Sequence, residues 1–129
     1  MTTILIVCFG FVASTYMRKR LSKAKLVLFG DNKLYGQSKW LGGAKSQDGI
    51  VYGVPGDHPQ VLRVDPRTSK ITTIGPAFKG KNKWLRGVTS SLNGCIYMIP
   101  ACADRVLKLD PRTEKVSLIG PSFERFSKW

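Results

Sequence analysis

The sequence predicts an all-β protein built from repeated four-stranded antiparallel sheets, and two observations carry this prediction. First, the pattern of residues 39–78 recurs at residues 83–123, so that Trp40 reappears as Trp84. Second, each copy contains short apolar runs that are separated by glycine, proline, asparagine or aspartate. A repeat of roughly 40 to 50 residues is the usual length of one four-stranded blade of a β-propeller. We therefore expect an incomplete propeller-type fold of about two to three blades, fewer than a closed ring requires.

The apolar runs of each copy define the predicted strands. Turn residues and prolines bound these runs, and the run Gln60-Val61-Leu62-Arg63-Val64 mixes apolar and polar side chains as a strand with one buried face does. The predicted strands cover residues 40–45, 50–54, 60–64 and 70–74 in the first copy and residues 84–90, 95–99, 105–109 and 115–119 in the second.

Turn residues connect the predicted strands. Asp48-Gly49 and Asn93-Gly94 follow the first strand of each copy, where they predict a two-residue hairpin turn with positive φ at both positions. Asp65-Pro66 and Asp110-Pro111 follow the third strand. Proline fixes φ at the first corner of a turn, and the aspartate accepts a hydrogen bond from a backbone N–H two or three residues later. We assign all four pairs to the fold, since one carboxylate per turn supplies too few oxygens for calcium.

Small residues mark the first strand of each copy as the innermost strand of its blade. The first copy has Gly42-Gly43-Ala44 there, and the second copy has Gly87-Val88. Blades crowd together near a propeller axis, where small side chains permit close approach. Trp40 and Trp84 begin these strands, and we expect each indole to anchor the packing between blades with its N–H on a loop carbonyl. The alternative is that these two rings stack on a ligand.

The N-terminal part of the chain has a different composition. Residues 2–17 are mostly apolar and precede a basic cluster at residues 18–25. The apolar stretch is shorter than the roughly 20 residues that span a bilayer, and no positive residue precedes it. It predicts a membrane-facing or signal-like segment, a degenerate blade strand or an artefact of the gene boundary. The predicted domains are therefore an N-terminal segment (1–25), a first blade preceded by the last strand of another (26–83), and a second blade followed by the start of the next (84–129).

Charge is the unusual feature of the composition. Lysine and arginine number 21 against 8 aspartate and glutamate residues, which gives a net charge of +13. Such an excess attracts polyanions, but the basic residues are spread along the chain without an RNA-binding motif or zinc-finger spacing. Cys8, Cys95 and Cys102 form no disulfide framework and no metal motif. This cysteine pattern fits an intracellular or membrane-associated protein better than a secreted one, although it does not fix the compartment.

The motifs resemble a recurrent and largely uncharacterised propeller repeat. That repeat runs Lys-Trp-x-Gly-Gly, then Asn-Gly-x-Ile-Tyr-Gly-Ile-Pro, then Val-Leu-x-Ile-Asp-Pro-x-Thr, and this chain matches it at residues 39–43, 49–55 and 61–68. The repeat is similar to kelch propellers and to six-bladed lactonase or lyase propellers, and the resemblance covers residues 26–129. The resemblance implies propeller blades but no catalytic residue, because the motifs of the enzymatic propellers are missing. The second copy departs from the pattern at Arg86 and Met98.

The loop between the two copies is the surface that we expect to contact a partner. It carries Lys79, Lys81 and Lys83, and a basic loop with aromatic neighbours suits an anionic partner. Trp40 and Trp84 complete this candidate surface. The other interpretation is a solvated linker between blades.

His58 is the only histidine and lies in the predicted loop between the second and third strands. Together with Asp57 it could form an acid–base pair. An isolated imidazole in a proline-rich turn is more often a solvent-facing side chain, so we include His58 among the contact residues only. We expect no catalytic residue, no metal site and no cofactor.

Several functional classes follow from these observations. The leading hypothesis is a non-enzymatic protein-interaction or scaffold module, and its rivals are a fragment of a hydrolase-type or lyase-type propeller and a polyanion-binding or nucleic-acid-binding protein. An incomplete set of blades exposes two apolar faces, so we expect a protein partner or self-association that completes a ring. An anionic partner and membrane contact through residues 2–17 are further options. Lys128-Trp129 opens another repeat, which favours a partial protein whose isolated chain is marginally stable or self-associating.

Overall fold

The computed structural model describes residues 36–123, which form β-strands and no helix. The strands are β1 (Trp40–Lys45), β2 (Val51–Pro55), β3 (Val61–Asp65), β4 (Lys70–Ile74), β5 (Trp84–Thr89), β6 (Ile96–Pro100), β7 (Val106–Asp110) and β8 (Lys115–Ile119). They form two four-stranded sheets in the orders β1-β2-β3-β4 and β5-β6-β7-β8, and all neighbouring strands are antiparallel. The predicted all-β, propeller-type fold of four-stranded blades is confirmed, and the two described blades do not close into a ring.

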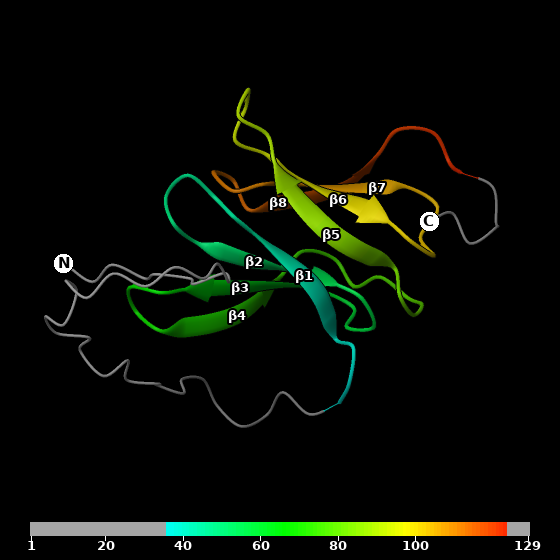
Figure 1. Ribbon diagram of the computed structural model, residues 1–129, viewed down its shortest axis with the longest axis horizontal. Helices are drawn as coiled ribbons and strands as arrows, with labels where there is room; N and C mark the ends of the chain where they lie inside the picture. The colour runs from blue at the N-terminus through cyan, green and yellow to red at the C-terminus, as the bar shows by residue number, and fades with distance from the viewer. Residues whose placement is uncertain (1–35, 124–129) are drawn as a thin grey trace, which may run out of the picture.

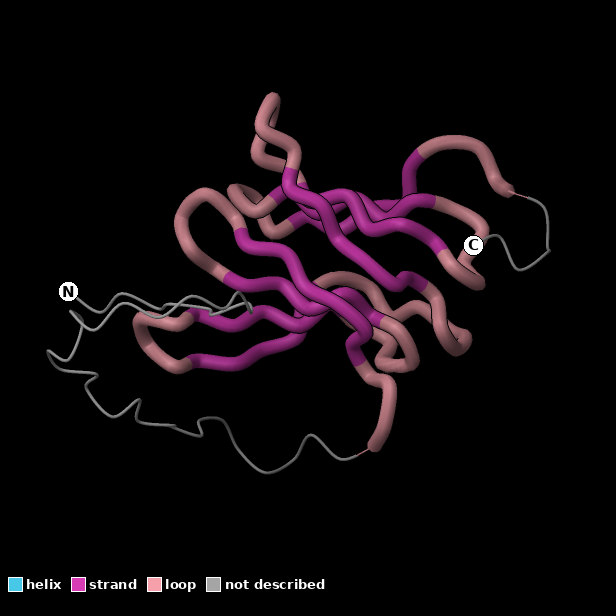
Figure 2. The backbone as a smooth tube through the Cα atoms, in the orientation of Figure 1, coloured by secondary structure: helices cyan, strands magenta, loops and turns pink. Residues whose placement is uncertain are grey.

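We call the first sheet blade 1 and the second sheet blade 2. Within each blade the strands neighbour one another in chain order, and β1 and β5 lie side by side where the blades meet (Figures 1 and 2). The predicted strand at residues 26–30, the apolar segment at residues 2–17 and the repeat start at Lys128-Trp129 lie outside the described residues.

The core lies between the two blades. Because successive side chains of a strand point to opposite faces, each blade presents one face to the other. The central buried side chains are Tyr52, Val54 and Val61 from blade 1 and Ile96, Met98, Leu107 and Leu109 from blade 2. The fold is therefore held together by packing between blades rather than by a core inside either blade.

Gly42 allows β1 and β5 to approach closely. A Cβ atom on Gly42 would lie 2.6 Å from the carbonyl oxygen of Leu85, which is closer than real Cβ contacts. Gly87 in β5 is packed similarly, since its Cβ atom would lie 3.2 Å from a methyl group of Val54. The small residues of the first strands thus permit the close contact between blades that the sequence predicts.

The hairpin turns differ from the prediction. Gly49 and Gly94 have positive φ angles of 91° and 71°, but Asp48 and Asn93 do not, so the predicted two-residue turns are wrong. The backbone N–H of Gly49 instead donates to the carbonyl of Ser46, which makes a longer loop in which only the glycine is left-handed. The second and third strands of each blade begin one residue later than predicted, and β5 ends at Thr89 rather than at residue 90.

The turns between the third and fourth strands are formed as predicted. A carboxylate oxygen of Asp65 accepts a hydrogen bond from the backbone N–H of Arg67 at 3.0 Å, and Asp110 accepts from Arg112 at 3.0 Å. Each aspartate thereby satisfies a turn N–H that the strands leave unpaired.

Candidate functional site

The loop between the blades is fixed to blade 1 at both ends. The backbone N–H of Phe78 donates to the carbonyl oxygen of Pro59 at 2.9 Å. The backbone N–H of Asn82 donates to a carboxylate oxygen of Asp57 at 2.8 Å. Residues 79–81 lie between these two bonds and are exposed, so the loop presents Lys79 and Lys81 to solvent from a constrained backbone.

Lys83 ties this loop to blade 1 from a buried position. Its side chain is buried, and the ammonium donates to the carbonyl oxygens of Gly56 at 2.5 Å and Gly80 at 3.0 Å. Burial lowers the pKa of Lys83, against the opposing attraction of the Asp57 carboxylate. The structure therefore gives Lys83, which we predicted as a partner contact, a role in the junction between the blades.

The lowered pKa of Lys83 should make the free energy of unfolding depend on pH. Between the lowered pKa of the folded state and the usual value of 10.5, the unfolded chain binds more protons, so the free energy of unfolding should rise with pH. Urea denaturation at a series of pH values up to 10.5 should show this rise in the wild type relative to Lys83→Met. The quantity to follow is the free energy of unfolding of the wild type minus that of Lys83→Met. Burial raises the pKa of Tyr52, and this lowers the stability of both proteins above pH 10.0, so the effect of Tyr52 cancels in the subtraction. A difference that stays constant with pH would contradict the prediction, and Lys39→Met at the partly exposed equivalent position is the matched control.

The loop between β6 and β7 faces this lysine-bearing loop. The backbone N–H groups of Ala101 and Ala103 donate to the carbonyl oxygen of Lys83 at 2.8 and 3.1 Å, and that of Cys102 donates to the carbonyl of Asn82 at 3.0 Å. Both loops are thus fixed to the same short segment at the start of β5. Their spacing is set by backbone hydrogen bonds and not by mobile side chains.

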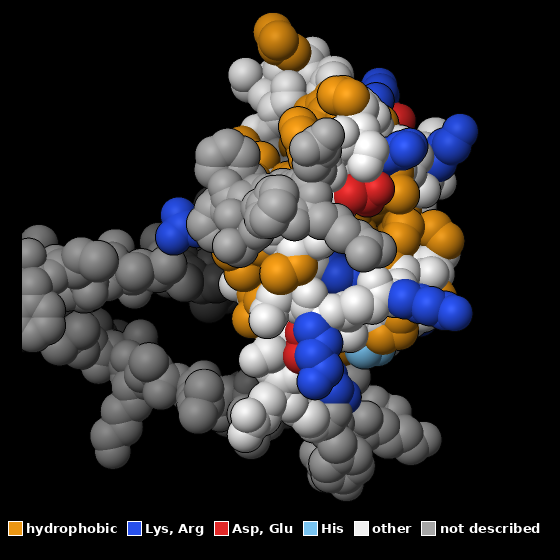
Figure 3. Space-filling view, turned by 90° about the vertical axis from the view of Figure 1, so that its right-hand side faces the viewer, with side chains coloured by type: hydrophobic (Ala, Val, Ile, Leu, Met, Phe, Trp, Pro, Cys, Tyr) orange, Lys and Arg blue, Asp and Glu red, His pale blue; other side chains and the backbone are white. Residues whose placement is uncertain are grey.

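A groove lies between these two loops, and we call it the interblade groove. Its volume is about 420 Å³, and its lining includes Phe78, Lys79, Lys81, Lys83, Trp84, Ala103 and Leu118. Four of the six predicted contact residues therefore lie in one place. The groove combines apolar side chains with lysines, and Figure 3 shows basic side chains projecting from a face of the molecule on which apolar side chains are also exposed.

Trp84 closes the inner end of the interblade groove. Its indole is 2% exposed and packs edge-on against Phe78, with ring centroids 5.1 Å apart and an interplanar angle of 74°. The indole N–H donates to the carbonyl oxygen of Arg105 at 2.9 Å, as predicted for a packing anchor. Burial leaves little of the ring for a ligand, so Trp84 shapes the groove and joins the blades.

Trp40 and His58 are not part of this groove. Their rings pack together with centroids 4.5 Å apart, and the indole N–H of Trp40 donates to the carbonyl oxygen of Gln60 at 3.0 Å. The backbone N–H of Gln60 donates to Nδ1 of His58 at 3.1 Å, so the imidazole closes its own turn and is partly buried rather than solvent-facing. The carboxylate of Asp57 binds Asn82 instead of the imidazole, and the acid–base interpretation loses its geometric basis.

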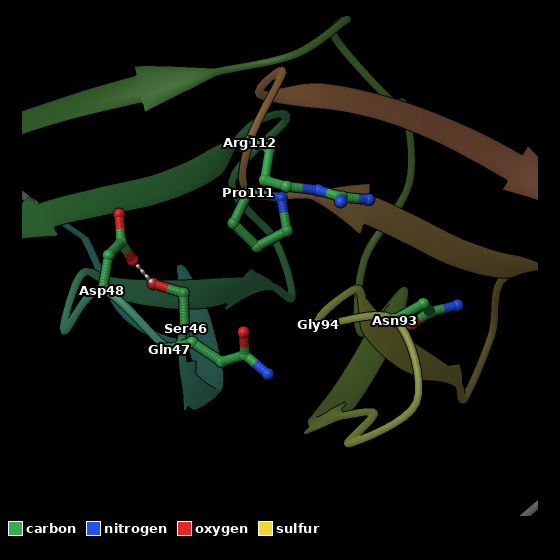
Figure 4. Close-up of a pocket in the computed structure, with 7 residues that line it drawn as sticks. All are labelled: Ser46, Gln47, Asp48, Asn93, Gly94, Pro111 and Arg112. Atoms are coloured by element: carbon green, nitrogen blue, oxygen red, sulfur yellow. Dashed lines mark hydrogen bonds between the residues drawn. The ribbon is translucent and has the colours of Figure 1, made fainter.

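A second, smaller cavity lies at the hairpin tips (Figure 4). Its volume is about 190 Å³, and it is lined by residues of three turns, including Ser46, Asp48, Asn93, Pro111 and Arg112. The sequence predicts Asp48, Asn93 and Pro111 as turn residues only, and it does not single out Ser46 or Arg112. The repeat itself could have indicated this cavity. Equivalent turns of adjacent blades lie at the same end of the two blades, so the turns that contain Asp48 and Asn93 are expected to be neighbours.

Ser46, Asp48 and Arg112 in this second cavity have partners within their own turns. The Ser46 hydroxyl donates to the carboxylate of Asp48, and this bond lowers the pKa of Asp48. Arg112 binds the Asp110 carboxylate with an Nε–oxygen distance of 3.5 Å. The cavity therefore offers fewer free binding groups than the interblade groove.

The described residues also bear on metal binding and on membrane crossing. Among residues 36–123, no three histidine, cysteine, aspartate or glutamate side chains gather where a metal ion could bind. The same residues include no helix with the length and apolar character needed to cross a membrane. Comparisons with protein-family models, curated proteins and solved structures found no match for this chain.

Proposed function

We propose that this protein is a non-enzymatic interaction module whose blades form a scaffold and whose interblade groove binds an acidic segment of a partner protein. The proposal depends on one observation, namely that a constrained loop presents the exposed Lys79 and Lys81 beside the apolar side chains of Phe78 and Leu118. A scaffold role also agrees with the resemblance of the sequence to kelch-like propeller repeats.

The chemistry of the groove favours a partner with carboxylates next to an apolar side chain. Apolar contacts with Phe78 and Leu118 would contribute affinity, and the two lysines would select negative charge and accelerate association. Asp104 lies at the edge of the groove, where its carboxylate accepts a hydrogen bond from the Ser122 hydroxyl at 3.1 Å. This single acid leaves the groove with an excess of positive charge, which disfavours basic partners.

Charge reversal in the groove tests this proposal. The probe is a fluorescein-labelled short peptide of glutamates that flank one phenylalanine, and its binding is followed by fluorescence anisotropy at physiological salt. The double variant Lys79→Glu and Lys81→Glu should weaken binding by about tenfold or more, because it replaces two attractive charges with repulsive ones.

A second double variant separates the groove from the bulk charge of the chain. Lys70→Glu and Lys115→Glu change the net charge equally at exposed strand starts outside the groove. Binding should fall by less than about threefold in this control, since screening weakens distant charges. An equal loss of binding in the two double variants would favour polyanion binding through bulk charge and would refute a role for the groove.

A further inference from the structure

Each blade has an inner face that packs against the other blade and an outer face on the opposite side. Side chains alternate between the two faces along each strand. Val88, Tyr97, Ile99 and Val106 lie on the outer face of blade 2. They are the repeat equivalents of Ala44, Tyr52, Val54 and Val61, which form the inner face of blade 1.

The reverse relation holds for the outer face of blade 1. Val51, Gly53, Leu62 and Val64 lie there, and their equivalents Ile96, Met98, Leu107 and Leu109 form the inner face of blade 2. The two outer faces thus repeat the two faces that already pack together inside the molecule. These two kinds of face pack together once, between the blades, and the described pair of blades presents the same two kinds of face again on its two outer sides.

Side chains on the outer faces are much more exposed than their repeat equivalents on the inner faces. Val54 is fully buried, whereas its equivalent Ile99 is 43% exposed. Ile96 is fully buried, whereas its equivalent Val51 is 38% exposed. Val88 on the outer face of blade 2 is 58% exposed. Apolar side chains exposed on a flat sheet face are typical of a surface that meets another protein.

The side chains on the two outer faces differ in size from those of the internal junction, in opposite directions. Blade 2 carries larger residues than the inner face that it repeats, with Val88 in place of Ala44 and Ile99 in place of Val54. Blade 1 carries smaller residues than the face that it repeats, with Val51, Gly53 and Val64 in place of Ile96, Met98 and Leu109. The changes have opposite signs, so the added and removed volumes partly offset each other across an interface between the two outer faces.

We infer that a second copy of this chain stacks the outer face of its blade 1 on the outer face of blade 2. The contact joins two different surfaces, so it is heterologous, and it extends the blade array in a head-to-tail manner. This inference does not depend on the proposed function, because the interblade groove is lined by loop residues together with Trp84 and Leu118, and none of them lies on an outer face.

Two departures from the internal junction make the contact between copies weaker. Arg86 lies on the outer face of blade 2 where Gly42 allows close approach at the internal junction, so the copies cannot approach as closely there. The ion pair between Arg63 and Glu114, with an Nε–oxygen distance of 2.7 Å, joins the two blades. Its equivalent would pair Lys108 with an uncharged serine, Ser69. The association should therefore be reversible rather than permanent.

Sedimentation velocity of the full chain over a range of concentrations tests this inference. The wild type should show reversible, concentration-dependent association. Ile99→Glu and Val51→Glu should each weaken it by about tenfold or more, because a carboxylate would be desolvated against apolar side chains. Arg86→Gly should strengthen it, because it restores the close approach of the first strands. Leu92→Glu is the control, since Leu92 is 96% exposed at a hairpin tip away from both outer faces.

Mixing two variants distinguishes a heterologous contact from a symmetric one. The Ile99→Glu chain keeps an intact outer face on blade 1, and the Val51→Glu chain keeps an intact outer face on blade 2, so a mixture should form a one-to-one complex. Far-UV circular dichroism must show that both variants fold, and Val88→Glu replaces Ile99→Glu if the latter does not. A wild type that is monomeric at every concentration would overturn the inference, as would association that neither variant weakens or that mixing fails to restore. The Lys79→Glu and Lys81→Glu variant should associate like the wild type, so failure of the groove and failure of the stacking give different results.

Discussion

Replacing Trp84 by alanine should lower the free energy of unfolding by about 3–5 kcal/mol, the usual range for a buried aromatic residue in a core. The indole is almost fully buried between the blades, packs against Phe78 and donates its N–H to the carbonyl of Arg105. The variant loses this packing and leaves the carbonyl of Arg105 without that donor. Urea denaturation followed by far-UV circular dichroism measures the effect without relying on tryptophan fluorescence.

Trp40→Ala is the matched control for this result. Trp40 occupies the equivalent position and makes the equivalent indole hydrogen bond to Gln60, but its ring is only partly buried because no described blade covers it. We expect the free energy of unfolding to fall by about 1–2 kcal/mol, since the indole of Trp40 buries less apolar area than that of Trp84. Equal losses of unfolding free energy in the two variants would mean that each tryptophan stabilises the protein through packing inside its own blade and not through packing between blades.

Gly75→Ala should lower the free energy of unfolding by about 2–4 kcal/mol, for two separate reasons. Gly75 has a φ angle of 81°, a conformation that costs an alanine about 1 kcal/mol. A Cβ atom there would also lie 2.7 Å from a methyl group of Val116 in blade 2, and such overpacking costs about 1–3 kcal/mol. Thermal and urea denaturation of the variant measure the sum.

Gly120→Ala separates the two contributions. Gly120 is the equivalent residue of blade 2, with a φ angle of 76°, and no atom lies within 4 Å of its potential Cβ position. This variant should therefore lose only the backbone contribution of about 1 kcal/mol. A loss as large as that of Gly75→Ala would show that the contact with Val116 contributes little to the junction between the blades.

The elements of the fold could be predicted from the sequence because their signals are local. Apolar runs bounded by turn residues predicted each strand, and Asp65-Pro66 predicted a turn whose hydrogen bond the structure contains. The type of hairpin at Asp48-Gly49 could not be predicted in the same way. The bond from the Ser46 N–H to the Ile50 carbonyl depends on where the strands stop pairing, and the dipeptide alone does not contain that information.

The candidate site depended more strongly on contacts between distant parts of the chain. The sequence identified Lys79, Lys81 and Lys83 as one basic loop, but it did not indicate that Lys83 is buried. That difference arises because Gly56, 27 residues earlier, places its carbonyl oxygen beside the ammonium of Lys83. The opposite wall of the interblade groove comes from the loop between β6 and β7, so its shape follows only from the packing of blade on blade.

The hairpin between β5 and β6 contains one residue more than its counterpart between β1 and β2, as residues 90–95 replace residues 46–50. The extra length is accommodated at a tip where Leu92 is almost wholly exposed, and the pairing of the flanking strands is the same in both blades. Loops tolerate insertions and deletions better than the strands that they connect. A tip of this kind lets a lineage accumulate such length changes without moving the side chains on which neighbouring units depend.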